Sequence, residues 1–256
     1  MNRRNFLKYT FHTVAALIIG REIKEMFLPS PAQAIPTPGR WGFLVDTFKC
    51  IGCGFCVQAC KLENGIPLEA NVSRTWIERY LVTAEETFID APKEGRLGFL
   101  DIRLELKPGK SLAVPKEKIK KAFFVPKLCN QCAKPPCVQV CPVGATYQTI
   151  EGITLVDRQW CIGCGYCIMA CPYGMRFFHP LYHVADKCNF CYHRLKRNLQ
   201  PACVQACPMA ARLIGNLRNE QDPVTRTILG ERVAILKSEY GTKPQVYYLG
   251  LSEEVR

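Results

Sequence analysis

Apolar and polar residues alternate along this chain only in short stretches. Leu100–Leu106 alternates residue by residue and predicts a strand, because successive strand side chains point to opposite faces. Glycine and proline interrupt the sequence throughout, and long helical periodicity is scarce. The pattern therefore predicts an α+β fold of short elements joined by extensive loops. We expect further strands at Trp41–Thr47, Gly152–Val156 and Gln245–Leu249, and short helices at Gln58–Asn64 and Val204–Arg212.

The start of the chain reads as an export signal rather than as part of this fold. Arg3-Arg4 precedes a short apolar stretch, Thr13–Gly20, which is too short to span a bilayer but suits a signal peptide. Ala32-Gln33-Ala34 offers a cleavage site. These features predict a twin-arginine signal over residues 1–34 and a folded domain over residues 35–256. A basic amphipathic helix is the alternative interpretation of the first segment.

The candidate chemistry lies in sixteen cysteines, which fall into four groups of four. The third group has the complete C-x2-C-x2-C-x3-C-P spacing of bacterial ferredoxins, and three of the four groups end in Cys-Pro. In two-cluster ferredoxins the cysteine before the proline binds the other cluster. We therefore expect the last cysteine of each group to bind a cluster whose other three ligands come from a different group. The groups are Cys50, Cys53, Cys56 and Cys60; Cys129, Cys132, Cys137 and Cys141; Cys161, Cys164, Cys167 and Cys171; and Cys188, Cys191, Cys203 and Cys207.

Glycines inside these loops fit the same chemistry. A residue without Cβ lets the backbone wrap closely around a cubic cluster and direct N–H groups at its sulfurs. Sixteen thiolates can hold four [4Fe–4S] clusters, and a chain that holds four clusters transfers electrons. The glycines are Gly52, Gly54, Gly163 and Gly165.

Two other uses of cysteine compete with this interpretation. Structural zinc favours pairs of C-x2-C set far apart, whereas the first and third groups each place three cysteines within seven residues. Disulfides suit an exported chain with an even cysteine count, but neighbours at C-x2-C-x2-C cannot all pair with one another. The fourfold recurrence of the spacing favours clusters over both.

The cysteine groups belong to an internal duplication. Residues 50–60 read CIGCGFCVQAC, and residues 161–171 read CIGCGYCIMAC. Residues 137–142 read CVQVCP, and residues 203–208 read CVQACP. The first group therefore matches the third, and the second matches the fourth, which indicates a duplicated two-cluster module.

The duplication predicts two intertwined, ferredoxin-like modules. One combines residues 41–70 with residues 185–215, and the other comprises residues 122–182. An insertion at about residues 82–121 separates the first two cysteine groups, and Lys107-Pro108-Gly109-Lys110 within it reads as a turn of an inserted hairpin. A solvated surface hairpin and a docking element for a partner subunit are both open interpretations of this insertion.

These motifs resemble those of a known family over about residues 40–250. The chain is similar to the four-cluster ferredoxin-like electron-transfer subunits of bacterial membrane-associated oxidoreductases, such as dimethyl-sulfoxide, polysulfide and tetrathionate reductases. Others of the family accompany nitrite reduction and hydrogenases. Lys61, where the other groups have proline after the last cysteine, also fits the family's first motif. The most specific segments are LCNQCAKPPCVQVCPVGA (128–145), ACPYGMRFFHP (170–180), ADKCNFC (185–191), PACVQACP (201–208) and GTKPQVYYLG (241–250).

The resemblance implies which cysteines share a cluster. Since no ligand position is vacant, it implies four [4Fe–4S] clusters. Cluster A would take Cys50, Cys53, Cys56 and Cys207; cluster B would take Cys129, Cys132, Cys137 and Cys171; cluster C would take Cys161, Cys164, Cys167 and Cys141; and cluster D would take Cys188, Cys191, Cys203 and Cys60.

The resemblance also implies a function without substrate chemistry. Such a subunit relays single electrons between a quinone-reactive membrane subunit and a catalytic oxidoreductase subunit of molybdopterin type. The sequence contains no Walker loop, dinucleotide fingerprint or nucleophile elbow. A hydrogenase, nitrite or sulfur-metabolism complex is the alternative setting. Two further interpretations are a structural metal-binding protein and an enzyme with an open iron site, although an open site would need a missing cysteine.

The predicted signal and the predicted clusters explain each other. Clusters are inserted in the cytoplasm, and the twin-arginine route exports a protein that is already folded. We therefore expect a periplasmic protein, peripheral on the cytoplasmic membrane through its partners. Beyond the signal, no apolar run is long enough for a membrane span.

The formal net charge of +12 would suit nucleic acid, but most of it is accounted for otherwise. The predicted signal holds five basic and two acidic residues, a net +3. Each oxidised cluster with four thiolates carries about −2, so the mature protein with four clusters would have a net charge of about +1. The sequence also lacks an aromatic and basic repeat for base stacking. We therefore exclude nucleic acid as a partner.

Because much of the interior is expected to be inorganic, metal binding should supply part of the folding free energy. We predict that the iron-free chain is not stably folded. Circular dichroism on anaerobically chelated protein should show no cooperative thermal transition. A native-like transition in iron-free protein would contradict this prediction.

Overall fold

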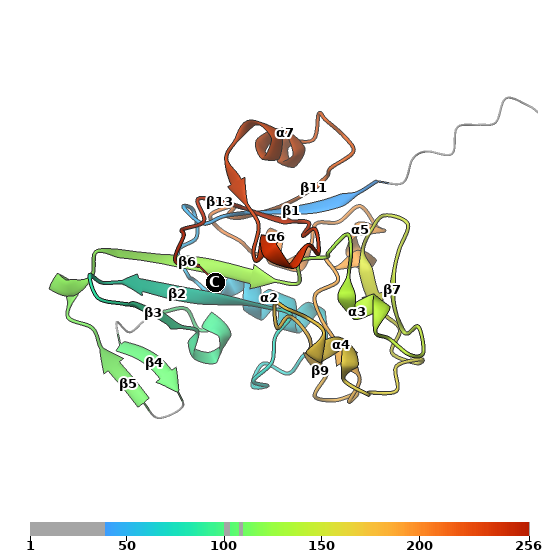
Figure 1. Cartoon of the computed structure of the whole chain (residues 1–256), viewed down its shortest axis with the longest axis horizontal. Helices are drawn as coiled ribbons and strands as arrows, with labels where there is room; N and C mark the ends of the chain where they lie inside the picture. The colour runs from blue at the N-terminus through green and yellow to red at the C-terminus, as the bar shows by residue number, and fades with distance from the viewer. Residues whose placement is uncertain (1–38, 100–102, 108–109, 256) are drawn as a thin grey trace, which may run out of the picture. The chain divides into compact units, whose positions relative to one another are not determined.

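The computed structural model describes residues 39–99, 103–107 and 110–255. The predicted signal over residues 1–34 lies outside them, as do Leu100 to Ile102 of the alternating stretch. Within the described ranges, no helix has the length and apolar character needed to cross a bilayer. The α+β class is confirmed, because short helices alternate with short strands (Figure 1).

The predicted first and last strands lie side by side in a four-stranded sheet. β1 (Trp41–Asp46) pairs antiparallel with β11 (Arg212–Asn216) and parallel with β13 (Val246–Leu249). β12 (Val233–Ala234) closes the edge beyond β13. β1 is buried on both faces, and α7 (Pro223–Gly230) packs against β1 and β11 (Figure 1). The ends of the domain are therefore held together by this sheet.

A second sheet carries the insertion. β2 (Thr75–Val82) pairs antiparallel with β6 (Lys121–Leu128) along its whole length, and β3 (Thr87–Asp90) pairs with the other edge of β2. The last pair of the β2–β6 register is Val82 with Lys121. Those two residues are the predicted limits of the insertion, so β2 and β6 form the base from which the inserted segment extends.

The inserted segment contains a pair of strands and two short 3-10 helices. β4 (Arg103–Lys107) pairs antiparallel with β5 (Lys110–Ala113). The helix η1 (Pro92–Gly95) packs against β2, and η2 (Lys116–Lys118) precedes β6. The Arg96 carbonyl, just after η1, accepts a hydrogen bond of 2.8 Å from the Gln58 side chain. The insertion therefore contacts the helix Phe55–Glu63, which carries Cys56 and Cys60.

Short elements surround the remaining cysteines. Two small antiparallel pairs follow the second and third cysteine groups, and the helices are four to nine residues long. The third 3-10 helix, η3 (Ser238–Tyr240), precedes β13. The strand pairs are β7 (Thr146–Gln148) with β8 (Thr154–Val156) and β9 (Phe177–Phe178) with β10 (Ala185–Asp186); the helices are α2 (Phe55–Glu63), α3 (Pro136–Gln139), α4 (Tyr166–Met169), α5 (Tyr192–Leu195) and α6 (Ala202–Gln205).

One predicted helix was wrong in extent. The helix expected over Val204–Arg212 is α6, which ends at Gln205, and Arg212 begins the strand β11. Pro208 has no N–H to continue a helix, and proline also disfavours helical backbone in the residue before it. The helix expected at Gln58–Asn64 begins three residues earlier, at Phe55. The strands expected at 152–156 and 245–249 are β8 and β13.

A single large hydrophobic core joins both sheets to the cysteines. Phe43 of β1, Ile77 of β2 and Val125 of β6 are at most 1% exposed. The Phe43 and Phe190 rings lie 5.4 Å apart, and Phe190 stands between two cysteines of the fourth group. Buried Cys56, Cys188 and Cys203 belong to the same apolar cluster. These three sulfurs are thus part of the core rather than an addition to its surface.

Candidate metal centres

The duplicated loops have the same backbone. Gly52 and Gly163 both have φ of 71°, while Gly54 and Gly165 have φ of 81° and 79°. Gly54 and Gly165 precede α2 and α4 in the left-handed conformation that only glycine adopts at low cost. A Cβ on Gly54 would lie 2.4 Å from the Arg96 carbonyl oxygen. The sequence repeat is therefore a repeat of structure.

Sulfurs from opposite ends of the domain meet at the first site. An apolar cavity is lined by Cys50, Cys53 and Cys56 of the first group together with Cys207 of the fourth. Arg212 also lines this cavity. Burial raises the pKa of the Cys50 thiol to about 11. We call this place site A, after the cluster expected there, and name sites B, C and D in the same way.

Strand register explains why Cys207 reaches site A. Val45 of β1 pairs with Arg212 of β11 in antiparallel register. Cys50 lies five residues after Val45, and Cys207 lies five residues before Arg212. The two cysteines therefore lie beyond the same end of the strand pair, each five residues along the chain from the Val45–Arg212 pair.

Site C repeats this arrangement. Thr146 of β7 pairs with Val156 of β8, again antiparallel. Cys141 lies five residues before Thr146, and Cys161 lies five residues after Val156. The same pairing rule thus directs the last cysteine of the second group toward the first cysteine of the third. α3, which precedes Cys141, packs against α4 of the third group.

Site D gathers the deepest sulfurs. Cys60 is fully buried, and its electrostatic neighbours are Cys188, Cys203 and Cys191. Burial and these neighbours raise the pKa of Cys60 well above that of a free thiol. The Asn64 side chain donates to the Cys60 sulfur at 3.6 Å. α2, which carries Cys60, packs against α6, which carries Cys203.

Site B combines the second group with the end of the third. The electrostatic neighbours of Cys132 include Cys129, Cys137 and Cys171. Burial raises the pKa of Cys132 to about 12, with those sulfurs adding to the effect. The Arg176 guanidinium donates a hydrogen bond of 3.1 Å to the Cys137 sulfur.

The four sites form a continuous series in the order A, D, B, C. One pair of cysteines links each two neighbouring sites. The first two pairs interact electrostatically, and the third pair belongs to one buried apolar cluster. The pairs are Cys56 with Cys203, Cys188 with Cys129, and Cys137 with Cys167. Sequence spacing alone did not predict this order.

The donor set fits iron–sulfur clusters. All sixteen cysteines lie within the described residues, and none of them forms a disulfide there. Among the described residues, no three His, Cys, Asp or Glu side chains gather closely enough to hold one single metal ion. Backbone N–H groups point at several sulfurs, which stabilises thiolate charge. The donors are Thr146 N–H to Cys141, Ala211 N–H to Cys207 and Phe190 N–H to Cys188, at 3.4, 3.3 and 3.4 Å.

Hydrogen bonding distinguishes Cys141 from the deeper cysteines. Burial opposes ionisation, but N–H groups of Thr146, Val143 and Ala145 outweigh it and lower the pKa of Cys141. Cys164 is the one exposed cysteine of the sixteen. Site C therefore lies nearer to the surface than site D.

Buried basic residues are the functional groups that sequence reasoning missed. Arg212, Lys187 and Arg176 are 1, 2 and 4% exposed. Burial opposes their charge, but Cys56, Cys203 and Cys50 raise the pKa of Arg212. A sequence signal did exist, because Arg176 and Arg212 each stand five residues after the cysteine of a Cys-Pro pair.

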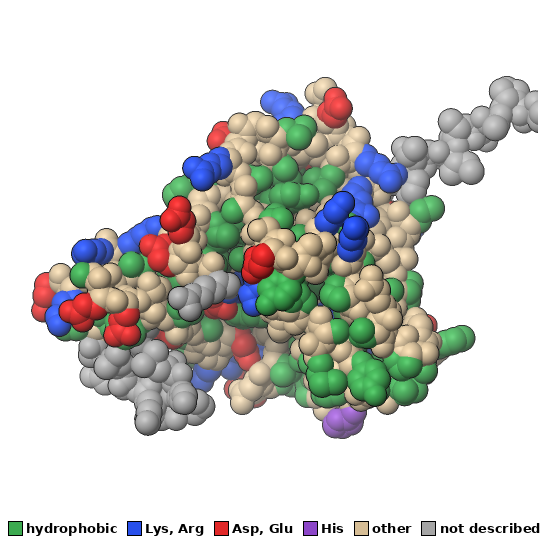
Figure 2. Space-filling view, in the orientation of Figure 1, with side chains coloured by type: hydrophobic (Ala, Val, Ile, Leu, Met, Phe, Trp, Pro, Cys, Tyr) green, Lys and Arg blue, Asp and Glu red, His purple; other side chains and the backbone are tan. Residues whose placement is uncertain are grey.

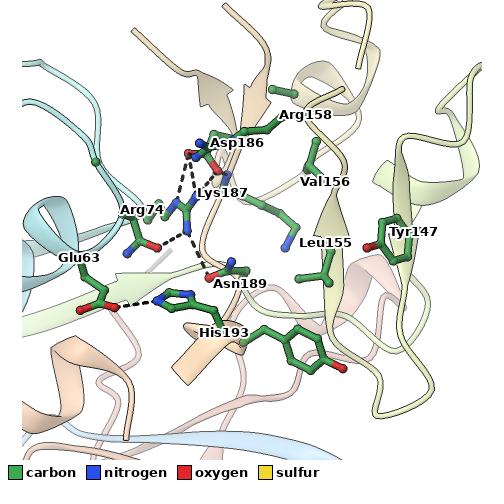
Figure 3. A pocket seen from close by; sticks show the side chains of 14 residues that line it. Glu63, Arg74, Tyr147, Leu155, Val156, Arg158, Asp186, Lys187, Asn189 and His193 are labelled. Carbon is green, nitrogen blue, oxygen red and sulfur yellow. Dashed lines mark hydrogen bonds and ion pairs between the residues drawn. The ribbon is translucent and has the colours of Figure 1, made fainter. Parts of the chain in front are cut away.

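Another buried ion pair supports site D from its outer side. Arg74 contacts Asp186 at 2.8 Å and donates to the side chains of Asn64 and Asn189 at 2.5 and 3.2 Å. Figure 3 shows Arg74 between Asp186 and Asn189, in a cavity of about 510 Å³ that His193 also lines. Since Asn64 donates to Cys60, this network orients the loops around site D. Lys61, noted in the sequence, is buried and pairs with Glu94 at 3.0 Å.

Comparison with known protein families finds the same domain twice in this chain. Residues 49–145 and residues 120–217 each match the 4Fe–4S dicluster domain. The two matches overlap at residues 120–145, which contain the second cysteine group.

Comparison with individual proteins finds relatives along most of the chain. One relative is a tetrathionate reductase subunit of Salmonella typhimurium, which is 38% identical over 241 residues, covering 93% of this chain and 83% of the relative. The corresponding tetrathionate reductase subunit of Archaeoglobus fulgidus is 40% identical over 214 residues, 83% of each chain. Arsenate respiratory reductase iron–sulfur subunit ArrB of a Shewanella species is 32% identical, covering 82% of this chain and 96% of the relative.

Proposed function

Because the chain belongs to the family of iron–sulfur electron-transfer subunits with two 4Fe–4S dicluster domains, we propose that it relays single electrons through four [4Fe–4S] clusters. The observation that carries the proposal is the continuous series of sites A, D, B and C. Each cluster, when bound, accepts one electron and passes it on. The chain exchanges electrons with a catalytic subunit and transforms no substrate itself.

The ligand sets of the proposal are those that the sequence resemblance implies. Clusters A and D exchange their fourth ligands, Cys207 and Cys60, within one module. Clusters B and C exchange Cys171 and Cys141 within the other. The protein's own contribution is to orient these thiolates, direct N–H groups at sulfur and keep water out of the deep sites.

The exchange of ligands is testable by substitution. Cys207→Ser should remove cluster A, lowering iron from about sixteen to about twelve atoms per chain, whereas Cys203→Ser should remove cluster D. Iron analysis and paramagnetic resonance after dithionite reduction would measure both. If the two variants lost the same resonance signal, the cysteines of the fourth group would share one cluster, and the exchange would be wrong.

The proposed partners are a catalytic oxidoreductase subunit, of molybdopterin type, and a quinone-reactive membrane subunit. The names of the relatives support the first, since they include tetrathionate, arsenate and selenate reductases. The proposal for the second comes from the family resemblance of the sequence.

An exposed apolar surface at site C suits such a partner. Trp160, Ile162, Tyr166 and Met169 are each at least 54% exposed and surround Cys164 in the chain. Figure 2 shows hydrophobic side chains gathered over the region of α4 and β9. An electron must leave the series where a ligand approaches the surface, and site C is such a place. We assign this surface, the site C face, to a partner subunit with its own redox centre.

Met169→Glu should weaken that association roughly tenfold or more, because it would bury an unpaired carboxylate in an apolar interface. The measurement is co-purification with the catalytic and membrane subunits from detergent-solubilised membranes, at unchanged iron content. Leu229→Glu is the matched control, since Leu229 is 74% exposed on α7. Equal yields of complex from both variants would refute the assignment.

We also propose export by the twin-arginine route to the periplasmic side of the membrane. Support comes from Arg3-Arg4, the apolar stretch after them and the A-x-A sequence at Ala32 to Ala34. Replacing both arginines by lysine should retain the loaded protein in the cytoplasm, as cell fractionation and immunoblotting would show. Arg21→Lys is the control, and periplasmic protein from the double variant would contradict the proposal.

A further inference from the structure

The described residues contain eight buried lysines and arginines, and their pairing divides them into two classes. Five have a carboxylate within ion-pair distance. These five are Lys61 with Glu94, Arg74 with Asp186, Arg79 with Asp90, Arg96 with Glu69, and Lys127 with Glu78. The remaining three, Arg176, Lys187 and Arg212, form no ion pair with a carboxylate among the described residues.

Arg212 lies between sites A and D. It lines the cavity of Cys50, Cys53 and Cys56, and Cys203 of site D is among its electrostatic neighbours. Both terminal nitrogens of its guanidinium are buried without a hydrogen-bond partner in the described part of the chain. The counter-charge of this guanidinium is therefore the negative charge of the thiolates and of the clusters that they bind.

Arg176 lies between sites B and C. It donates to the Cys137 sulfur of site B at 3.1 Å and to the Thr146 hydroxyl at 3.2 Å. Cys167 of site C is its next electrostatic neighbour after Cys137, and its Nε is buried without a partner. The attraction of these sulfurs outweighs burial and raises the pKa of Arg176.

Lys187 lies between sites D and B. Its ammonium donates to the carbonyl oxygens of Thr154 and Cys188. Cys129 and Cys137 of site B and Cys188 of site D are its sulfur neighbours. Burial lowers the pKa of Lys187, and nearby Arg176 adds to that effect, while these sulfurs oppose it. Carbonyl oxygens satisfy its hydrogen bonds but carry no full negative charge, so the groups that favour its charge are the sulfurs on either side.

The duplication reinforces the pattern. The residue five positions after the last cysteine of a group is an arginine in two of the four groups. It is Arg212 after Cys207 and Arg176 after Cys171. The other two groups have Thr146 after Cys141 and Gly65 after Cys60. Each module therefore keeps one arginine at one of two equivalent positions, and the two modules keep it at different ones. Lys187 supplies the cation where the modules meet.

Electrostatics makes these residues a coherent set. A buried cation without a counter-charge is strongly unfavourable, and five of the eight avoid this cost with a carboxylate. A cluster with four thiolates carries about −2 when oxidised and about −3 when reduced, with no proton taken up. A cation that lies between two such clusters has negative charge beside it whether the clusters are oxidised or reduced.

We propose that Arg212, Lys187 and Arg176 are shared counter-charges, one for each step of the electron-transfer series, that raise the reduction potentials of the two clusters they separate. The inference rests on the four clusters of the proposed function. With clusters bound, an electron moving between the two sites beside one of these cations would leave the total charge around that cation unchanged. These three side chains place a positive charge beside the clusters and do not ligate iron.

The test is a redox titration of the purified holoprotein followed by paramagnetic resonance. Arg212→Gln should move the midpoint potentials of clusters A and D to more negative values and leave B and C unchanged. Lys187→Met should move D and B, and Arg176→Gln should move B and C. Arg212→Lys, Lys187→Arg and Arg176→Lys keep the charge and should restore potentials close to those of the parent protein.

Arg79→Gln is the control, because Arg79 is equally buried but has Asp90 at 2.7 Å. It should move no potential. Unchanged potentials in the three neutral variants, or equal shifts in Arg79→Gln, would overturn the inference. A parent protein without about sixteen iron atoms would instead overturn the proposed function.

If a neutral variant loses clusters, the experiment can still distinguish a role of charge from a role in packing. Iron content then replaces the potential as the measurement, and the charge-preserving variant at the same position becomes the comparison. Full iron in the charge-preserving variant supports a role for charge. Equal loss in both variants shows a role in packing alone and overturns the inference.

Discussion

Sulfur atoms from distant parts of the chain must converge in a water-free interior, and this convergence is the constraint that the rest of the structure serves. Antiparallel strand pairs achieve it. β1 with β11 and β7 with β8 place cysteines five residues beyond the last paired residue on both strands. Because the strands are fixed by backbone hydrogen bonds and a buried core, the sulfurs are held even though the loops that carry them have few regular elements.

Burial of so many sulfurs creates an electrostatic problem as well as a geometric one. Thiolates in an apolar interior are unfavourable, and burial raises the pKa of Cys50, Cys132 and Cys203 to about 11, 12 and 12. N–H groups, bound iron and buried cations are the means of holding that charge inside. The same three means also set reduction potentials, so the stability of the fold and the energetics of electron transfer depend on the same contacts.

The insertion shows how an added segment can serve the site without supplying a ligand. Its base, β2 with β6, lies against the core, and Arg96 contacts the loop and helix that carry the first cysteines. The close approach of Arg96 to Gly54 leaves no room for a Cβ at that glycine. The inserted segment, for which a surface hairpin and a docking element were both open interpretations, therefore packs against the loop and helix that carry Cys53 and Cys56.

The sequence by itself determined the cysteine groups, the duplication, the special glycines, the α+β class and several short strands. These features are local: ligand spacing, backbone freedom and alternation are properties of a few neighbouring residues. Tertiary structure decided the order of the four sites and the position of Arg212 between two of them. Both depend on pairing between strands that are far apart in the chain, such as Val45 with Arg212, and no local pattern encodes which distant strand will supply the partner.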